Sequence, residues 1–123
     1  MIKVDYNNSD VVPLERSHLI EWFGEDGEYP TFKGVAGILN GELVAVAGIR
    51  IIRGYVMAFA DLKEEAMELK HVVHRNAIEL INEAKGRHKR IIAICDDTLE
   101  TAPRWLARLG FEQKEGDVWI WQR

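Results

Sequence analysis

Residues 55–60, YVMAFA, and residues 90–95, RIIAIC, flank the stretch of sequence that decides the fold. Both are short apolar runs typical of buried strands, and we expect the first to be buried on both faces. Between them apolar residues recur at helical spacings of three and four, at Ala66, Leu69, Val73, Ala77, Leu80 and Ala84. This pattern predicts a helix over residues 62–85, with a capping box in residues 61–64 and a stop at Gly86. A strand, a long helix and a strand form a crossover, so the two strands should be parallel.

The residues before the crossover predict a run of antiparallel strands. Asn40-Gly41 separates residues 32–39 from residues 42–52 and suits a two-residue type I′ turn, because both central positions need positive φ. Arg53-Gly54 predicts a second reversal into strand 55–60. Further upstream we expect a strand at residues 2–5, a helix at residues 14–23 with Pro13 in its first turn, and an acidic loop from Gly24 to Pro30.

The last third of the chain predicts a short helix and a hairpin. Residues 99–109 carry an inward-facing apolar stripe, and Gly110 would end this helix. Residues 111–114 and 118–122 then form two strands around a Gly-containing turn. The whole order predicts one α+β domain over residues 1–123. Its sheet would be mixed and mostly antiparallel, with a parallel strand-helix-strand crossover and helices on both faces.

Composition excludes several classes of function. The chain has 123 residues, 16 Lys and Arg against 20 Asp and Glu, and a net charge of −4, which argues against nucleic-acid binding by general charge. Cys95 is the only cysteine, so an intrachain disulfide is excluded, in keeping with a cytoplasmic protein. The longest uninterrupted apolar run is residues 55–60, so we expect no signal peptide and no membrane span.

Residues 102–111, APRWLARLGF, together with the order and spacing of the elements, resemble the GNAT acetyltransferase superfamily over nearly the whole length. The resemblance implies a GNAT-like fold in which acetyl-coenzyme A, the cosubstrate, enters between strands 55–60 and 90–95. It also implies that backbone N–H groups at Phe59, Ala60 and Asp61 stabilise the thioester oxygen while an amine attacks directly. The expected function is therefore N-acetyltransferase activity on a small-molecule or protein amine.

The sequence departs from the family pattern at two places. The family binds the pyrophosphate with a glycine-rich loop at the start of the central helix, whereas residues 66–71 here contain no glycine and Asp61, Glu64 and Glu65 are close by. Lys70, His71 and Arg75 are candidate side-chain contacts to the phosphates instead; the alternative is a solvated helix face. The family often places a proton-donating Tyr on the last helix, and Leu106 stands at that position here.

Carboxylates supply the remaining candidate site residues. Asp96, at the end of strand 90–95, could deprotonate an amine, and together with Asp61 it is a candidate catalytic residue; the alternative for Asp96 is a loop and helix cap. Acidic residues after the first helix, namely Glu25, Asp26 and Glu28, would attract an amine substrate or form a plain solvated loop.

Alternative functions and partners stay open. Residues 64–111 also resemble the GNAT-like internal virion proteins of short-tailed phages, which implies a catalytically silent structural or host-interaction module. Binding of another acyl-coenzyme A without transfer is a third alternative. His71 and His74 have no evident third ligand, so we expect no metal site. Trp119 and Trp121 share one strand face, which suits core packing or, if the indoles are exposed, a homodimer.

Overall fold

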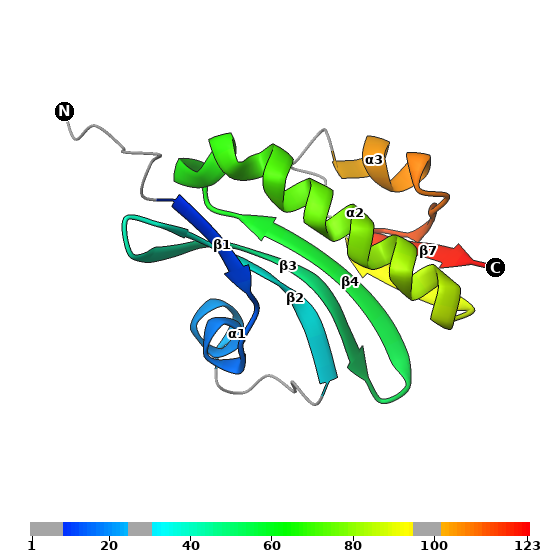
Figure 1. The fold of residues 1–123 in the computed structure, drawn as a ribbon. Helices are drawn as coiled ribbons and strands as arrows, with labels where there is room; N and C mark the ends of the chain where they lie inside the picture. The colour runs from blue at the N-terminus through cyan, green and yellow to red at the C-terminus, as the bar shows by residue number, and fades with distance from the viewer. Residues whose placement is uncertain (1–8, 25–30, 95–101) are drawn as a thin grey trace.

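The computed structural model describes residues 9–24, 31–94 and 102–123, which form an α+β fold around one mixed sheet (Figure 1). The strands are β1 (Ser9–Pro13), β2 (Thr31–Leu39), β3 (Glu42–Ile52), β4 (Tyr55–Leu62), β5 (Arg90–Ile94), β6 (Glu112–Glu115) and β7 (Val118–Gln122). The helices are α1 (Arg16–Phe23), the 3₁₀ helix η2 (Glu64–Leu69), α2 (Lys70–Arg87) and α3 (Ala102–Arg108). The sheet order is β1-β2-β3-β4-β5-β7-β6, and of these pairings β4–β5 alone is parallel. The predicted class, the parallel crossover and the mostly antiparallel sheet are confirmed.

Two tight turns build the β2-β3-β4 meander as predicted. Asn40 and Gly41 have φ of 52° and 81°, and Arg53 and Gly54 have φ of 51° and 84°. Positive φ at both central positions is the mark of a type I′ turn, whose twist matches that of the flanking strands. The hairpin strands therefore begin and end within two residues of the predicted limits.

The N-terminal prediction is wrong at Pro13. This residue ends β1, opposite Val35 of β2, and does not lie in the first turn of a helix. Proline is tolerated there because β1 is an edge strand. Helix α1 instead begins at Arg16, where the Glu15 N–H donates to Nδ1 of His18 at 2.9 Å as part of a capping box. The strand predicted at residues 2–5 lies outside the described residues, as do residues 99–101 of the last predicted helix.

The start of the central helix is also predicted wrongly. Asp61 and Leu62 continue β4, opposite Val46 and Ala45, so residues 61–64 do not form a capping box. The long partner strand β3 supplies backbone partners as far as Lys63, whose N–H donates to the Val44 carbonyl at 2.9 Å. Strand pairing thus overrides the local capping signal, and the α-helix begins at Lys70 after η2.

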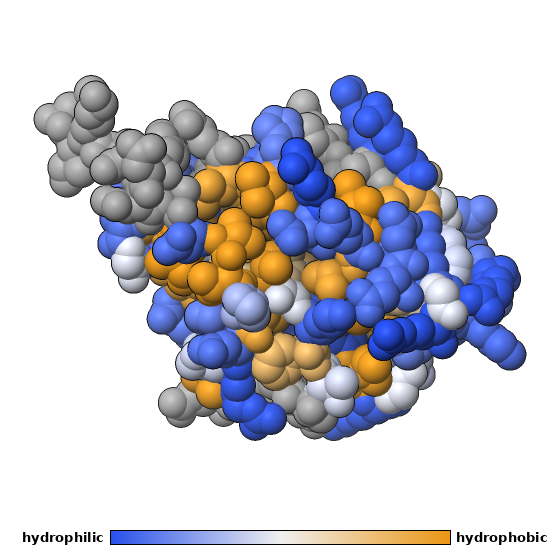
Figure 2. Space-filling view, in the orientation of Figure 1, coloured by the Kyte–Doolittle hydropathy of each residue, from blue (hydrophilic) through white to orange (hydrophobic). Residues whose placement is uncertain are grey.

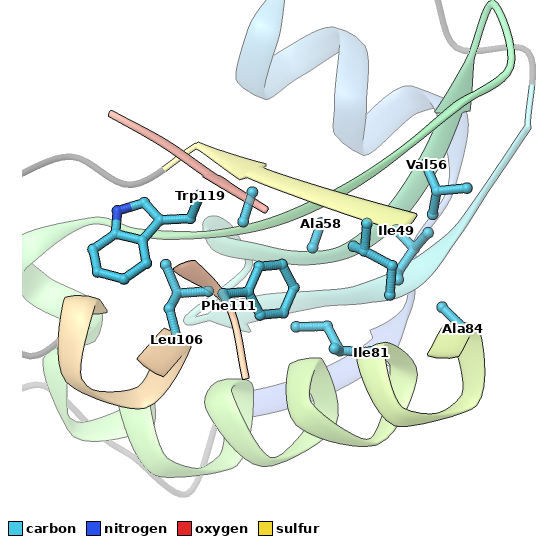
Figure 3. Packing of buried hydrophobic residues seen from close by; sticks show 10 residues of the cluster. Ile49, Val56, Ala58, Ile81, Ala84, Leu106, Phe111 and Trp119 are labelled. Carbon is cyan, nitrogen blue, oxygen red and sulfur yellow. The ribbon is translucent and has the colours of Figure 1, made fainter. Parts of the chain in front are cut away.

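Aliphatic and aromatic side chains fill the space between the sheet and the helices α2 and α3 (Figure 3). We call this side of the sheet the α2 face. Trp119 is 8% exposed and packs with Leu106 and Phe111, so the pair of exposed indoles that would favour a homodimer is not formed. The opposite side, the α1 face, carries a separate cluster around Leu19 of α1 and Val46 of β3. Helices on both faces were predicted and are confirmed.

Strand β4 differs from the prediction on its α1 face. Val56 and Ala58, which face α2, are buried, but Tyr55 is 56% exposed and Met57 and Phe59 are half-buried. The physical reason is the short length of α1, which has 8 residues and covers the β1–β3 side of the sheet. β4 is therefore fully buried on one face only.

Candidate functional site

The parallel seam between β4 and β5 is short. The strands are in register at Met57↔Ile92 and Ala58↔Ala93, while β4 continues to Leu62. Residues 59–62 of β4 thus extend beyond the last position paired with the described part of β5. This is the place where the sequence predicted an opening for acetyl-coenzyme A.

The alternation of hydrogen bonds along β4 determines which of its backbone groups face the predicted opening. The two-residue turn at Arg53-Gly54 makes Ile52 and Tyr55 a hydrogen-bonded pair, and such pairs alternate along an antiparallel ladder. Odd-numbered residues of β4 therefore bond to β3, as the bond from the Lys63 N–H to the Val44 carbonyl shows. Among the three predicted backbone donors, Phe59 and Asp61 point toward β3, and the N–H of Ala60 points toward the seam.

The side chain of Asp61 is engaged with α1. The Nε1–H of Trp22 donates to Oδ2 of Asp61 at 2.9 Å. The ammonium group of Lys63 lies 5.7 Å from the centre of the Trp22 ring and forms an ion pair with Glu42 at 3.4 Å. Asp61 is exposed, so its carboxylate can still reach a bound amine from solvent.

Near Asp61 on the same face, the rings of two phenylalanines lie against an arginine side chain. Phe23 of α1 and Phe59 of β4 meet edge to face, with centroids 6.0 Å apart and an interplanar angle of 83°. The Arg50 guanidinium carbon lies 5.2 Å from the Phe23 centroid and 5.9 Å from the Phe59 centroid. We call Arg50, Phe23 and Phe59 the arginine–phenylalanine cluster. Sequence reasoning missed it, although a charged residue inside the apolar strand at residues 42–52 was a signal.

The predicted phosphate ligands lie in the first two turns of α2. The N-cap residue, Leu69, makes no side-chain cap bond. Lys70 is half-buried, whereas His71 and Arg75 are exposed. These cations favour an anion here, while Glu64 and Glu65 of η2, which runs directly into α2, oppose one.

His74 lies one helical turn beyond Lys70. Burial, followed by the charges of Lys70 and His71, lowers the pKa of His74 below its usual 6.5. Neutral imidazole is thus favoured in the folded protein. Among the described residues, no three His, Cys, Asp or Glu side chains group to hold a metal ion.

Four predicted site residues cannot be placed, because Glu25, Asp26, Glu28 and Asp96 lie outside the described residues. The structure therefore brings Phe59, Ala60 and Asp61 together at one end of β4. Lys70, His71 and Arg75 form a separate group on α2. No helix in the described ranges has the length and apolar character needed to cross a membrane.

A groove of about 610 Å³ runs between α2 and the strands β1 and β2. Its lining includes Val11, Pro13, Val35 and Leu80, and Figure 2 shows apolar side chains beside the charged ones on this face. Lys33 and Glu83, which also line it, pair with each other at 3.1 Å. None of the predicted site residues that the structure describes lines this groove.

Comparisons of the chain with protein-family models, with curated proteins and with solved structures found no match. The assignment of a function therefore rests on the geometry of the site and on the resemblance found in the sequence.

Proposed function

We propose that this protein is a GNAT-like N-acetyltransferase that moves an acetyl group from acetyl-coenzyme A to an amine. The observation that carries the proposal is the Ala60 N–H, which faces the short β4–β5 seam beyond its last paired position. The strand order with one parallel crossover supports it, because the resemblance implies a seam between the same two strands.

Acetyl-coenzyme A would supply an activated acetyl thioester in the seam. The Ala60 N–H would donate to the thioester oxygen, where negative charge develops as the amine attacks. The amine nitrogen would form the new bond to the carbonyl carbon, the carbon–sulfur bond would break, and coenzyme A would leave as the thiolate, which takes a proton from solvent. Asp61 and Asp96 are the proposed acceptors of the amine proton.

The residues of α2 fit the phosphates of coenzyme A in part. Lys70, His71 and Arg75 offer cations near an uncapped helix start, and these would replace the glycine loop of the family. The exposed Glu64 and Glu65 reduce that attraction. We therefore propose side-chain recognition of the phosphates and expect it to be salt-dependent.

Thermal unfolding with and without acetyl-coenzyme A tests binding. A ligand at 100 times its Kd adds about 2.7 kcal/mol to the free energy of unfolding. The double charge reversal Lys70→Glu with Arg75→Glu should weaken this stabilisation, and Lys114→Glu, on the distant strand β6, should not. No stabilisation of the wild type at millimolar acetyl-coenzyme A would count against the proposal.

Replacing Ala60 by proline tests the carrying observation itself. The substitution removes an N–H that points away from β3, so the β3–β4 ladder keeps its bonds. We expect the rate of acetyl transfer to fall by about 10²–10³, as for the loss of one oxyanion donor. Acetyl-coenzyme A binding, measured in the same variant, reports whether the seam is intact. An unchanged rate would refute the assigned donor.

A catalytically silent GNAT-like module is the second candidate. The position at which the family places its proton-donating Tyr holds Leu106, which is 3% exposed and packs in the core of the α2 face. This residue has a packing role and no titratable proton. Stabilisation by acetyl-coenzyme A without transfer to any amine would favour this candidate.

A further inference from the structure

The arginine–phenylalanine cluster on the α1 face holds a cation, the Arg50 guanidinium, for which residues 9–24, 31–94 and 102–123 supply no ion-pair partner. The Arg50 guanidinium lies against the rings of Phe23 and Phe59, and its Nε is buried. Within the described part of the chain, no acceptor bonds to this Nε–H. A buried donor without a partner is costly. Because this Nε is itself buried, a ligand would bond to the terminal amino groups of the half-buried Arg50 side chain.

The surroundings of Arg50 orient its guanidinium. In the sheet Arg50 lies between its register partners, Phe32 of β2 and Met57 of β4. Phe23 of α1 contacts its guanidinium on the α1 face. Both rings flank the planar guanidinium, so its side-chain entropy is reduced before any ligand binds. A planar fork fixed in this way suits a carboxylate, which can accept two parallel bonds.

The charges near the cluster favour a ligand with a single negative charge. Lys63, the other cation on this side of β4, is paired with Glu42, and the Asp61 carboxylate is two residues from Phe59. One guanidinium balances one carboxylate, whereas a phosphate dianion would leave net negative charge beside Asp61. The rings and Met57 would contact an apolar or aromatic body.

We propose that the arginine–phenylalanine cluster binds the carboxylate of a small acid with an apolar or aromatic body. In the context of acetyl transfer this ligand is the acceptor, an amine that also carries a carboxylate; this extension rests on the proposed function. The site itself is independent of any reaction and is tested without acetyl-coenzyme A.

Titration of the protein with phenylacetate and with its neutral amide tests the site. The readout is the NMR signal of the Arg50 Nε–H, which should shift on addition of the acid. We expect phenylacetate to bind at least about tenfold more tightly than phenylacetamide. Equal affinity of the acid and the amide would overturn the proposal, and so would a shift of other signals with the Arg50 signal unmoved.

Three variants separate binding from stability. Arg50→Met should abolish the preference for the acid, Arg50→Lys should retain part of it, and Arg108→Met, on α3 at the other face, should retain all of it. Since methionine leaves no buried unpaired N–H, Arg50→Met should keep or raise the melting temperature. If Arg50→Met binds the acid as tightly as the wild type does, the site is refuted.

The outcome also distinguishes this site from the proposed function. If the wild type binds acetyl-coenzyme A but shows no preference for phenylacetate over phenylacetamide, the cluster alone is refuted. If instead phenylacetate binds at Arg50 and acetyl-coenzyme A does not bind, the site stands and the acetyltransferase proposal fails.

Discussion

The two faces of the β3–β4 hairpin are made by the same strands and serve different purposes. The α2 face carries Ala45, Ala47, Ile49, Val56 and Ala58, all of which are buried. The α1 face carries Gly48, Arg50, Phe59 and Asp61. The helices explain the difference, because α2 has 18 residues and spans several strands, whereas α1 has 8. The α2 face of the hairpin is thus filled by packing side chains, whereas its α1 face combines the buried Val46 with polar side chains at Arg50 and Asp61.

The largest expected effect is on the α2 face. Ile81 is 1% exposed, so Ile81→Ala should lower the free energy of unfolding by about 2–5 kcal/mol through lost burial and a cavity. Val72→Ala, at a position 40% exposed on the same helix, should change it by less than about 0.5 kcal/mol. Denaturant unfolding of both variants measures the contrast, and equal effects would mean that α2 does not pack as described.

Two glycine-to-alanine substitutions compare a crowded position on the α1 face, Gly48, with an open position on α2, Gly86. A Cβ on Gly48 would lie 2.3 Å from the Lys33 carbonyl oxygen and 2.7 Å from the Gly34 Cα, both backbone atoms. Gly48→Ala should therefore cost about 3 kcal/mol. The same change at Gly86 meets nothing within 4 Å and should stabilise α2 by about 0.5 kcal/mol. Opposite signs in thermal unfolding would bear out this account, and two losses would contradict it.

The bond between Trp22 and Asp61 should have a smaller effect on stability. Asp61→Ala removes the acceptor of the indole N–H at an exposed position, so we expect a loss of about 1 kcal/mol in the free energy of unfolding. Glu42→Ala breaks the exposed ion pair with Lys63 and should cost less than about 0.5 kcal/mol. Equal losses would show that the indole bond does not anchor α1.

The smallest effect concerns pH. The pKa of His74 is lower in the folded protein than in the unfolded chain, so the unfolded chain binds more protons below about pH 6.5. Above about pH 6.5 both states hold neutral imidazole and His74 does not lower the free energy of unfolding. As the pH falls below about 6.5 toward the lowered pKa, the free energy of unfolding decreases. His74→Gln should therefore lose less stability than the wild type between about pH 7 and pH 5. His71→Gln should reduce this pH dependence only in part, because the charge of His71 is the last of the three causes that lower the pKa of His74.

Local sequence signals predicted the elements better than their ends. The turns at Asn40-Gly41 and Arg53-Gly54 were predicted because positive φ has a clear residue preference. The start of α2 was not, because pairing with β3 extends β4 through Asp61, and one sequence contains no record of that register. The seam could be inferred from the crossover, but which amide faces it depends on the phase of the ladder.

The arginine–phenylalanine cluster was beyond prediction for a related reason. Its members come from α1, β3 and β4, at positions distant along the chain. Arg50 can be noticed in the sequence as a charged residue in an apolar strand. Its contacts with Phe23 and Phe59 can be identified only when the position of α1 on the sheet is known. Long-range contacts of this kind depend on tertiary packing and carry no local periodicity.

The short seam between β4 and β5 has a consequence for the order of folding. Strands β2, β3 and β4 pair with their neighbours in sequence, so closing each hairpin costs little loop entropy. β5 reaches β4 only after the chain has returned through α2, and in the described part of β5 two positions then pair with β4. We expect this contact to form late and to open first, so that amide hydrogens there exchange faster than those in the meander. The seam can then open without disrupting the meander.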